Sequence, residues 1–197
     1  MSHLPAKLRV YLLASYVAAT ILVAITVQTW PGDAWLRVWS VHGILLASLI
    51  ALAKLHPVLL APGAKFGYKV SVGTAPIFAA LLLLGTPAAV VVATAAVIVA
   101  NVALRRRYYN VLFNAAQTAG YVSVAGFIAF HIAPPVVPVH IDGLRSAGAV
   151  AAAAAASYLI NSWVVATAVA LQTKRSPWQL WRSQRRHDFV QELALYL

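Results

Sequence analysis

Long apolar runs constrain the fold of this 197-residue chain more than any other feature. A helix needs about 20 apolar residues to cross about 30 Å of hydrocarbon, because each residue adds about 1.5 Å. Four runs meet this requirement, and two shorter ones meet at Gly85 and Pro87, which suit a turn and a helix start. We therefore expect six spans, the third the shortest, at about residues 10–27, 35–55, 70–84, 87–104, 110–132 and 147–172.

Composition supports a membrane location. Hydrophobic residues make up 62% of the chain and charged residues 10%, whereas soluble domains have roughly 25% charged residues. The expected fold is an all-α, polytopic transmembrane helical bundle. Residues from 188 onward are apolar again but too few to cross, so a seventh span is expected to begin there and the chain to be part of a longer polypeptide.

The basic residues predict the orientation. The net charge is +11, and all lysines and arginines except Arg37 and Arg145 lie in the N-terminal segment, in alternate loops or after the sixth span. This positive-inside pattern predicts a cytoplasmic N-terminus and a cytoplasmic segment after the sixth span. Because topology accounts for the charge, a nucleic-acid partner is not expected.

Polar side chains form a stripe within the fifth expected span. Helical spacings of 4, 3 and 4 place them on one face, and they are Asn110, Asn114, Gln117 and Tyr121. An unpaired amide in hydrocarbon costs several kcal/mol. The stripe must therefore face another helix or a wet cavity. Ser157 and Asn161 share a face of the sixth span and are candidate partners, as is Asn101. The amides either hold helices together or form a ligand-binding or signalling site, and both interpretations stay open.

The segment before Pro76 is irregular. Residues 68–73 alternate at strand period, and if Thr74 caps a helix starting near Pro76, the third span is a half-helix of about 14 Å. Such backbone is tolerated only where protein or water covers it, so we expect Ser71 to Thr74 to line a cavity open to the cytoplasm. A plain helix kinked by Pro76 is the alternative. His42, inside the second span, is a further candidate for function, unless it only reaches the interface.

A basic, tryptophan-rich helix is expected at about residues 177–187. Ser176 is the expected N-cap, Pro177 the first helical residue and Gln179 the capping-box partner. Tryptophans at headgroup level and arginines facing anionic lipid would hold this collar on the cytoplasmic leaflet. A lever that passes motion to a following domain is the alternative. The collar side chains are Trp178, Trp181, Arg182, Arg185 and Arg186.

The chain offers little material for catalysis. It contains no phosphate loop, HExxH motif, GxSxG elbow or paired carboxylates, so no enzyme and no cofactor are expected. His131, His140 and Asp142 fall in a proline-rich outer loop without ligand spacing, so a metal site there is not expected. The absence of cysteine excludes thiolate sites and disulfides within the chain.

Three stretches carry a resemblance. "VSVGTAPIFAALLLLGTPAAVVVA", "RRRYYNVLFNAAQ" and "SYLINSWVVATAVALQTKRSPWQLWR" resemble the N-terminal membrane regions of bacterial HD-GYP and GGDEF signalling proteins, over roughly residue 57 to the C-terminus. The resemblance implies a sensory or anchoring module in the bacterial inner membrane. It also implies a cytoplasmic effector domain C-terminal to this sequence, which would carry the catalysis. A homodimer is left open.

Two other classes of function stay open. Six helices with an irregular third span are compatible with the substrate-binding membrane component of a small-molecule transporter, which uptake or tight ligand retention by the purified chain would indicate. A structural subunit of a membrane complex is the third interpretation, and a stable co-purifying partner would indicate it.

Overall fold

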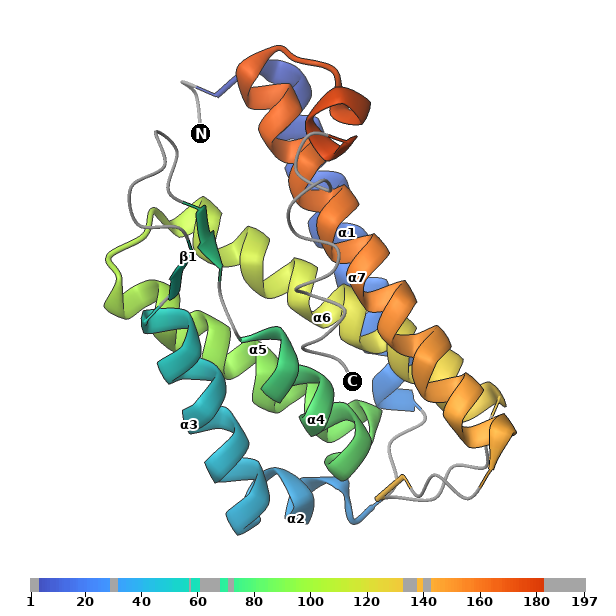
Figure 1. The fold of residues 1–197 in the computed structure, drawn as a ribbon. Helices are drawn as coiled ribbons and strands as arrows, with labels where there is room; N and C mark the ends of the chain where they lie inside the picture. Colours follow the sequence, from blue (N-terminus) through green and yellow to red (C-terminus); the bar gives the residue numbers. More distant parts are fainter. Residues whose placement is uncertain are drawn as a thin grey trace.

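The computed structural model describes residues 4–28, 32–56, 58–60, 68–70, 73–132, 138–139 and 143–182. The described chain is helical apart from one short hairpin (Figure 1), which confirms the expected helical fold. The elements are α1 (Ala6–Gln28), α2 (Ala34–Val38), α3 (Val41–Leu55), β1 (Val58–Leu60), β2 (Tyr68–Val70), α4 (Thr74–Leu84), α5 (Thr86–Ala103), α6 (Tyr108–Ile132) and α7 (Leu144–Thr173). Residues 177–182 are also helical.

Four helices, α1, α5, α6 and α7, are long and apolar enough to cross a membrane. The protein is therefore a membrane protein. The helices α3 and α4 are apolar but shorter, with 15 and 11 residues.

The expected span at 35–55 is divided, which corrects the sequence interpretation. Ser40 is extended and caps α3, because its hydroxyl accepts from the Gly43 N–H at 3.1 Å and donates to the Arg37 carbonyl at 2.7 Å. A Cβ at Gly43 would overlap the carbonyl oxygens of Arg37 and Val38. The corner therefore needs both a capping serine and a glycine three residues later. An analysis of hydrophobic run length alone does not detect this pair.

Arg37 ties this corner to the end of α4. Its guanidinium donates to the Leu84 carbonyl at 3.3 Å and to the Asp33 carboxylate at 3.0 Å. The hydrogen bond from Arg37 lowers the pKa of the exposed Asp33 carboxyl. The backbone N–H of Val139 donates to the Leu82 carbonyl at 2.9 Å, so residues of three connections meet at this end of the bundle.

The irregular segment before α4 is partly a hairpin. β2 pairs antiparallel with β1, with Leu59 opposite Lys69. The strand period expected at 68–73 is thus present at 68–70, while Ser71 and Val72 lie outside the described residues. The N-cap of α4 is Gly73 and Thr74 is the first helical residue, so the expected cap at Thr74 is wrong. A continuous helix over 70–84 is also excluded, and α4 is about 16 Å long.

The core is built around α5 from small side chains. α5 packs against α3, α4 and α6, and α6 in turn packs against α1 and α7. Several alanines of α5 are almost fully buried and let neighbouring backbones approach closely; they are Ala88, Ala89, Ala93, Ala96 and Ala100. A Cβ at Gly126 of α6 would overlap the Thr86 side chain, so the α5–α6 contact depends on that glycine.

The outer surface is apolar. On α1, exposed side chains recur at helical spacing and form one stripe, namely Val10, Leu13, Val17, Ile21 and Ile25. The exposed face of α3 carries Ile44, Leu45, Leu49 and Leu52. Water would disfavour apolar patches of this extent, whereas hydrocarbon accepts them. Both helices therefore have an apolar side that the described part of the protein leaves exposed.

Two helices end on a basic residue in the left-handed conformation. At the end of α5, Arg105 has φ 51°, and the Arg106 N–H donates to the Asn101 carbonyl at 3.0 Å. At the end of α7, Lys174 has φ 55°, and the Arg175 N–H donates to the Ala170 carbonyl at 3.0 Å. Glycine usually occupies such a position. The positive charge favours the negative end of the helix dipole, which offsets part of the backbone cost.

Replacement of Arg105 by glycine should stabilise the protein. A left-handed L-residue costs about 1 kcal/mol relative to glycine, so the Arg105→Gly variant should unfold at higher denaturant in mixed micelles. The control Arg106→Gly removes the same charge from a neighbouring exposed residue with no positive φ, and should not be stabilised. Equal behaviour of the two variants would contradict the assignment of strain to Arg105.

Candidate helix-coupling site

Asparagines link α5 to α6. The Asn114 amide donates to the Asn101 side-chain oxygen at 2.8 Å, and the Asn101 amide donates to the Val97 carbonyl at 2.8 Å. Asn101 is buried, with 7% of its surface exposed. Its own helix thus orients its amide, which leaves the side-chain oxygen free to accept from α6.

A second amide pair links α6 to α7. The Gln117 amide donates to the side-chain oxygen of Asn161 at 2.6 Å and to its backbone oxygen at 3.1 Å. Two hydrogen bonds to one residue fix both the rotation and the height of α7 relative to α6. Asn114 and Gln117 lie on neighbouring positions of the expected stripe, so α6 is joined to a helix on each side.

The other stripe residues have different surroundings. Asn110 is half-buried at the start of α6, and no hydrogen bond of its side chain is found within the described ranges. Tyr121 is buried and faces a crevice together with Ser157. The expected partnership of Ser157 with the amides is therefore not observed, whereas that of Asn161 and Asn101 is.

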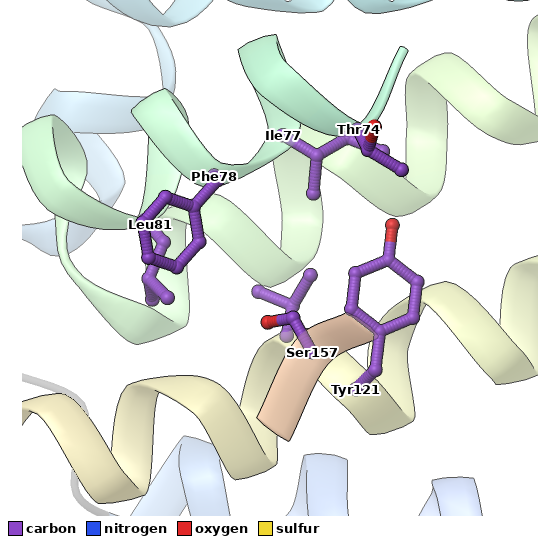
Figure 2. A pocket seen from close by; sticks show the side chains of 7 residues that line it. Thr74, Ile77, Phe78, Leu81, Tyr121 and Ser157 are labelled. Carbon is purple, nitrogen blue, oxygen red and sulfur yellow. The ribbon is translucent and has the colours of Figure 1, made fainter. Parts of the chain in front are cut away.

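The crevice lies between α4, α6 and α7. It holds about 180 Å³ of space, part of it open to the surroundings, and is too narrow for a water molecule as it stands. The lining side chains are Thr74, Ile77, Phe78, Leu81, Tyr121, Val122 and Ser157 (Figure 2). Of the expected cavity residues, only Thr74 is placed there. His42 is exposed in the first turn of α3 and is not part of it, and Ser71 lies outside the described residues.

The collar folds back along α7. The Trp181 indole N–H donates to the Ser162 hydroxyl at 3.2 Å, and its ring meets Trp163 edge to face at 5.5 Å and stacks on Trp178 at 5.2 Å. The helix over 177–182 follows Ser176, whose carbonyl accepts from the Leu180 N–H at 3.2 Å. Arg182 is exposed. Arg185 and Arg186, and the segment from 188, lie outside the described residues.

Tyrosines tie α1 to the same end of the bundle. The Tyr11 hydroxyl donates to the Val164 carbonyl and the Tyr16 hydroxyl to the Tyr109 carbonyl, both at 3.1 Å. Sequence reasoning missed these contacts and the role of Ser162. The signal available for the tyrosines was their position beside the basic segments, where aromatic residues of membrane proteins concentrate.

The outer-loop histidines form no identified site. His131 stacks on Phe127, with ring centroids 4.3 Å apart, while His140 and Asp142 lie outside the described residues. Within the part of the chain that the structure describes, no three His, Asp or Glu side chains come together as a metal site would require.

The fold and the polar contacts thus define a class, a helical membrane protein whose helices are joined by hydrogen bonds between side-chain amides. Comparison with known proteins finds no matching family model, no matching curated protein and no matching solved structure.

Loss of the Gln117 amide should destabilise the bundle. Leucine at this position would leave the Asn161 side chain without its partner in an apolar surrounding, at a cost of about 1 to 2 kcal/mol. The matched control is Asn110→Leu, which changes an amide of the same stripe that makes no observed side-chain hydrogen bond and should cost much less. Unfolding in mixed micelles measures both. A Gln117→Leu variant as stable as the Asn110→Leu variant would contradict the pairing with Asn161.

Proposed function

We propose that this chain is the membrane-embedded input and anchoring module of a bacterial signalling protein. In this proposal it lies in the inner membrane with six spans and a cytoplasmic N-terminus. It carries no catalysis itself and acts on a C-terminal cytoplasmic effector of the kind implied by the resemblance to HD-GYP and GGDEF proteins. The observation that carries the proposal is a series of three polar contacts, joined through α6 and α7, that leads from the bundle to the collar.

The connection crosses three helices. It begins at the Asn101–Asn114 pair between α5 and α6 and continues through the Gln117–Asn161 pair between α6 and α7. Asn161 is followed in the chain by Ser162, which accepts from Trp181 of the collar. A shift of α6 would therefore displace α7 and the helix over 177–182 together.

The mechanism requires two arrangements of these helices. Packed interfaces tend to switch between discrete arrangements because side chains interdigitate, and a stimulus favours the arrangement to which it binds more tightly. Exchange of the amide partners among Asn101, Asn114, Gln117 and Asn161 would separate the two states. The collar, which leads toward the C-terminal segment, would transmit the difference.

The surface of α3 supports six spans rather than four. At about 22 Å, α3 is shorter than the hydrocarbon layer, but its exposed face is apolar and its axis runs beside α5 (Figure 1). With α4 as a half-helix, the two would form a re-entrant or crossing pair. If α3 and α4 each cross the membrane, the segment between them lies at the basic end of the bundle.

The aromatic residues support the orientation. Tyr11 donates to Val164, next to the Trp163 that meets Trp181, while Tyr109 accepts from Tyr16 and its hydroxyl accepts from Arg107, one of the arginines that follow α5. From Leu144 to Trp163, α7 rises about 30 Å, the thickness of the hydrocarbon layer. An interfacial belt at this level would place the last turns of α7 in the cytoplasm. The inner boundary of the last span would then lie near residue 163 instead of 172.

The crevice favours one alternative. A substrate-binding membrane component of a transporter would need a site between helices, and the space between α4 and α7 is the candidate. Uptake of a solute by vesicles containing the chain and its transport partners would support that function instead.

The absence of cysteine from the sequence permits a clean topology test. Six spans place His56 in the cytoplasm, whereas four spans leave it outside. A His56→Cys variant should therefore react with a membrane-impermeant maleimide only after the cells are opened. Gly32→Cys is the external control, since nothing lies within 4 Å of a Cβ there, and Arg106→Cys is the internal one. Labelling of His56→Cys in intact cells would overturn the six-span topology.

The signalling role predicts an effect on output. Replacement of both Asn114 and Gln117 by leucine in the natural polypeptide should change the cellular level of the cyclic dinucleotide several-fold, because the bundle can no longer hold its amide pairing. Membrane insertion should be unaffected, and Asn110→Leu should leave output near that of the unmodified protein. If the double variant and the unmodified protein give equal output across growth conditions, the proposed coupling is wrong.

A further inference from the structure

The N-terminus of α4 carries a buried polar side chain inside an apolar protein. The first N–H groups of a helix have no partner within it, and the N-cap Gly73 has no side chain to accept from them. The hydroxyl of Thr74, the next residue, is buried and has no hydrogen-bond partner among the residues that the structure describes, with Thr74 itself 5% exposed. A buried unpaired hydroxyl is costly in such surroundings, and this one, unlike that of Thr94, also lines a crevice, so its position points to a ligand.

The crevice beside Thr74 combines polar and apolar walls. Figure 2 shows Thr74 and the Tyr121 hydroxyl on the same side, while Phe78 and Leu81 of α4 extend the wall away from them. The positive end of the α4 dipole lies at the Thr74 side. Oxygen acceptors are therefore favoured there, and hydrocarbon is favoured along Phe78 and Leu81.

The crevice is bounded by two helices that barely touch. α4 packs on α3 and α5, and it makes few contacts with α7. Since the space is too narrow for water, a ligand enters only when α4 and α7 separate. Separation breaks few contacts between α4 and α7, and the site is closed until then, because every residue that lines it is at most 5% exposed.

We infer that the crevice binds a free fatty acid from the bilayer. Its carboxyl group accepts from the Thr74 hydroxyl and from the N–H groups of Thr74 and Ala75, since Pro76 has no N–H to donate. Its hydrocarbon chain lies between α4 and α7 against Phe78, Leu81 and Val122. The site is distinct from the amide pairs, and binding to it is measured without any signalling output, so it stands or falls independently of the proposed function.

The test uses the full chain in nanodiscs of phosphatidylcholine, with lauric acid as the probe. Lauric acid should raise the melting temperature with saturation. In Thr74→Val, half-saturation should need about tenfold more acid, the effect of one lost hydrogen bond to a carboxylate. Thr74→Ser keeps the hydroxyl and should respond as the unmodified protein.

Thr94→Val is the matched control. The Thr94 hydroxyl on α5 is also buried and without a partner, but Thr94 does not line the crevice. Both valine variants should melt at a higher temperature without acid, since each removes an unpaired hydroxyl, and only Thr74→Val should lose the response. Equal responses of the two variants, or none in the unmodified protein, would overturn the site.

Two further measurements test whether the carboxyl head group is required and where the acid binds. Dodecylamine, which has the same chain length but no acceptor, should give no saturable stabilisation; an equal response would overturn the role of Thr74. A diazirine-bearing fatty acid should label the peptide containing residues 74–84 and those containing Val122 or Ser157. Labelling confined to other helices would overturn the site even if Thr74→Val failed to fold.

Discussion

Polar groups in a hydrocarbon surrounding must find partners inside the protein, and this requirement determines how the helices of the bundle are arranged. Hydrophobic burial cannot choose between arrangements here, because lipid is as apolar as a neighbouring helix. The bidentate contact from Gln117 to Asn161 can choose, since it is made at one rotation and one height of α7 only. The Asn101–Asn114 bond sets α5 in the same way, so one face of α6 positions two neighbours.

Close packing makes these hydrogen bonds reachable. The alanines of α5 and the absence of a side chain at Gly126 bring α5 and α6 near enough for short amide side chains to meet. Larger residues at these positions would separate the backbones and leave the amides unpaired. Small residues and amides therefore act together, the first supplying proximity and the second specificity.

The two ends of the bundle differ in their chemistry. One end gathers tyrosines, tryptophans and basic residues, and there α5 and α7 both terminate on left-handed basic residues. The other end is closed by the Arg37 contacts and by the capped corner between α2 and α3. Between them, Thr74 and Thr94 are exceptions to the pairing rule within the described residues, because their hydroxyls are buried without a partner, and of the two Thr74 lines the crevice. Such exceptions in membrane proteins are concentrated at functional sites.

The sequence by itself determined the class of protein, the helices and the polar stripe, since run length and the 3.6-residue period depend only on local residue order. It identified Asn101, Ser157 and Asn161 as candidate partners, of which the structure pairs Asn101 and Asn161 with the amides. Only the tertiary structure decided which amide meets which, because pairing depends on the rotation of α5 and α7 about their axes. It also decided the break at Ser40, the start of α4 at Thr74 and the return of Trp181 onto Ser162. The return of Trp181 onto Ser162 is a contact between segments distant in the chain, whereas the break at Ser40 comes from local capping; hydrophobic periodicity records neither.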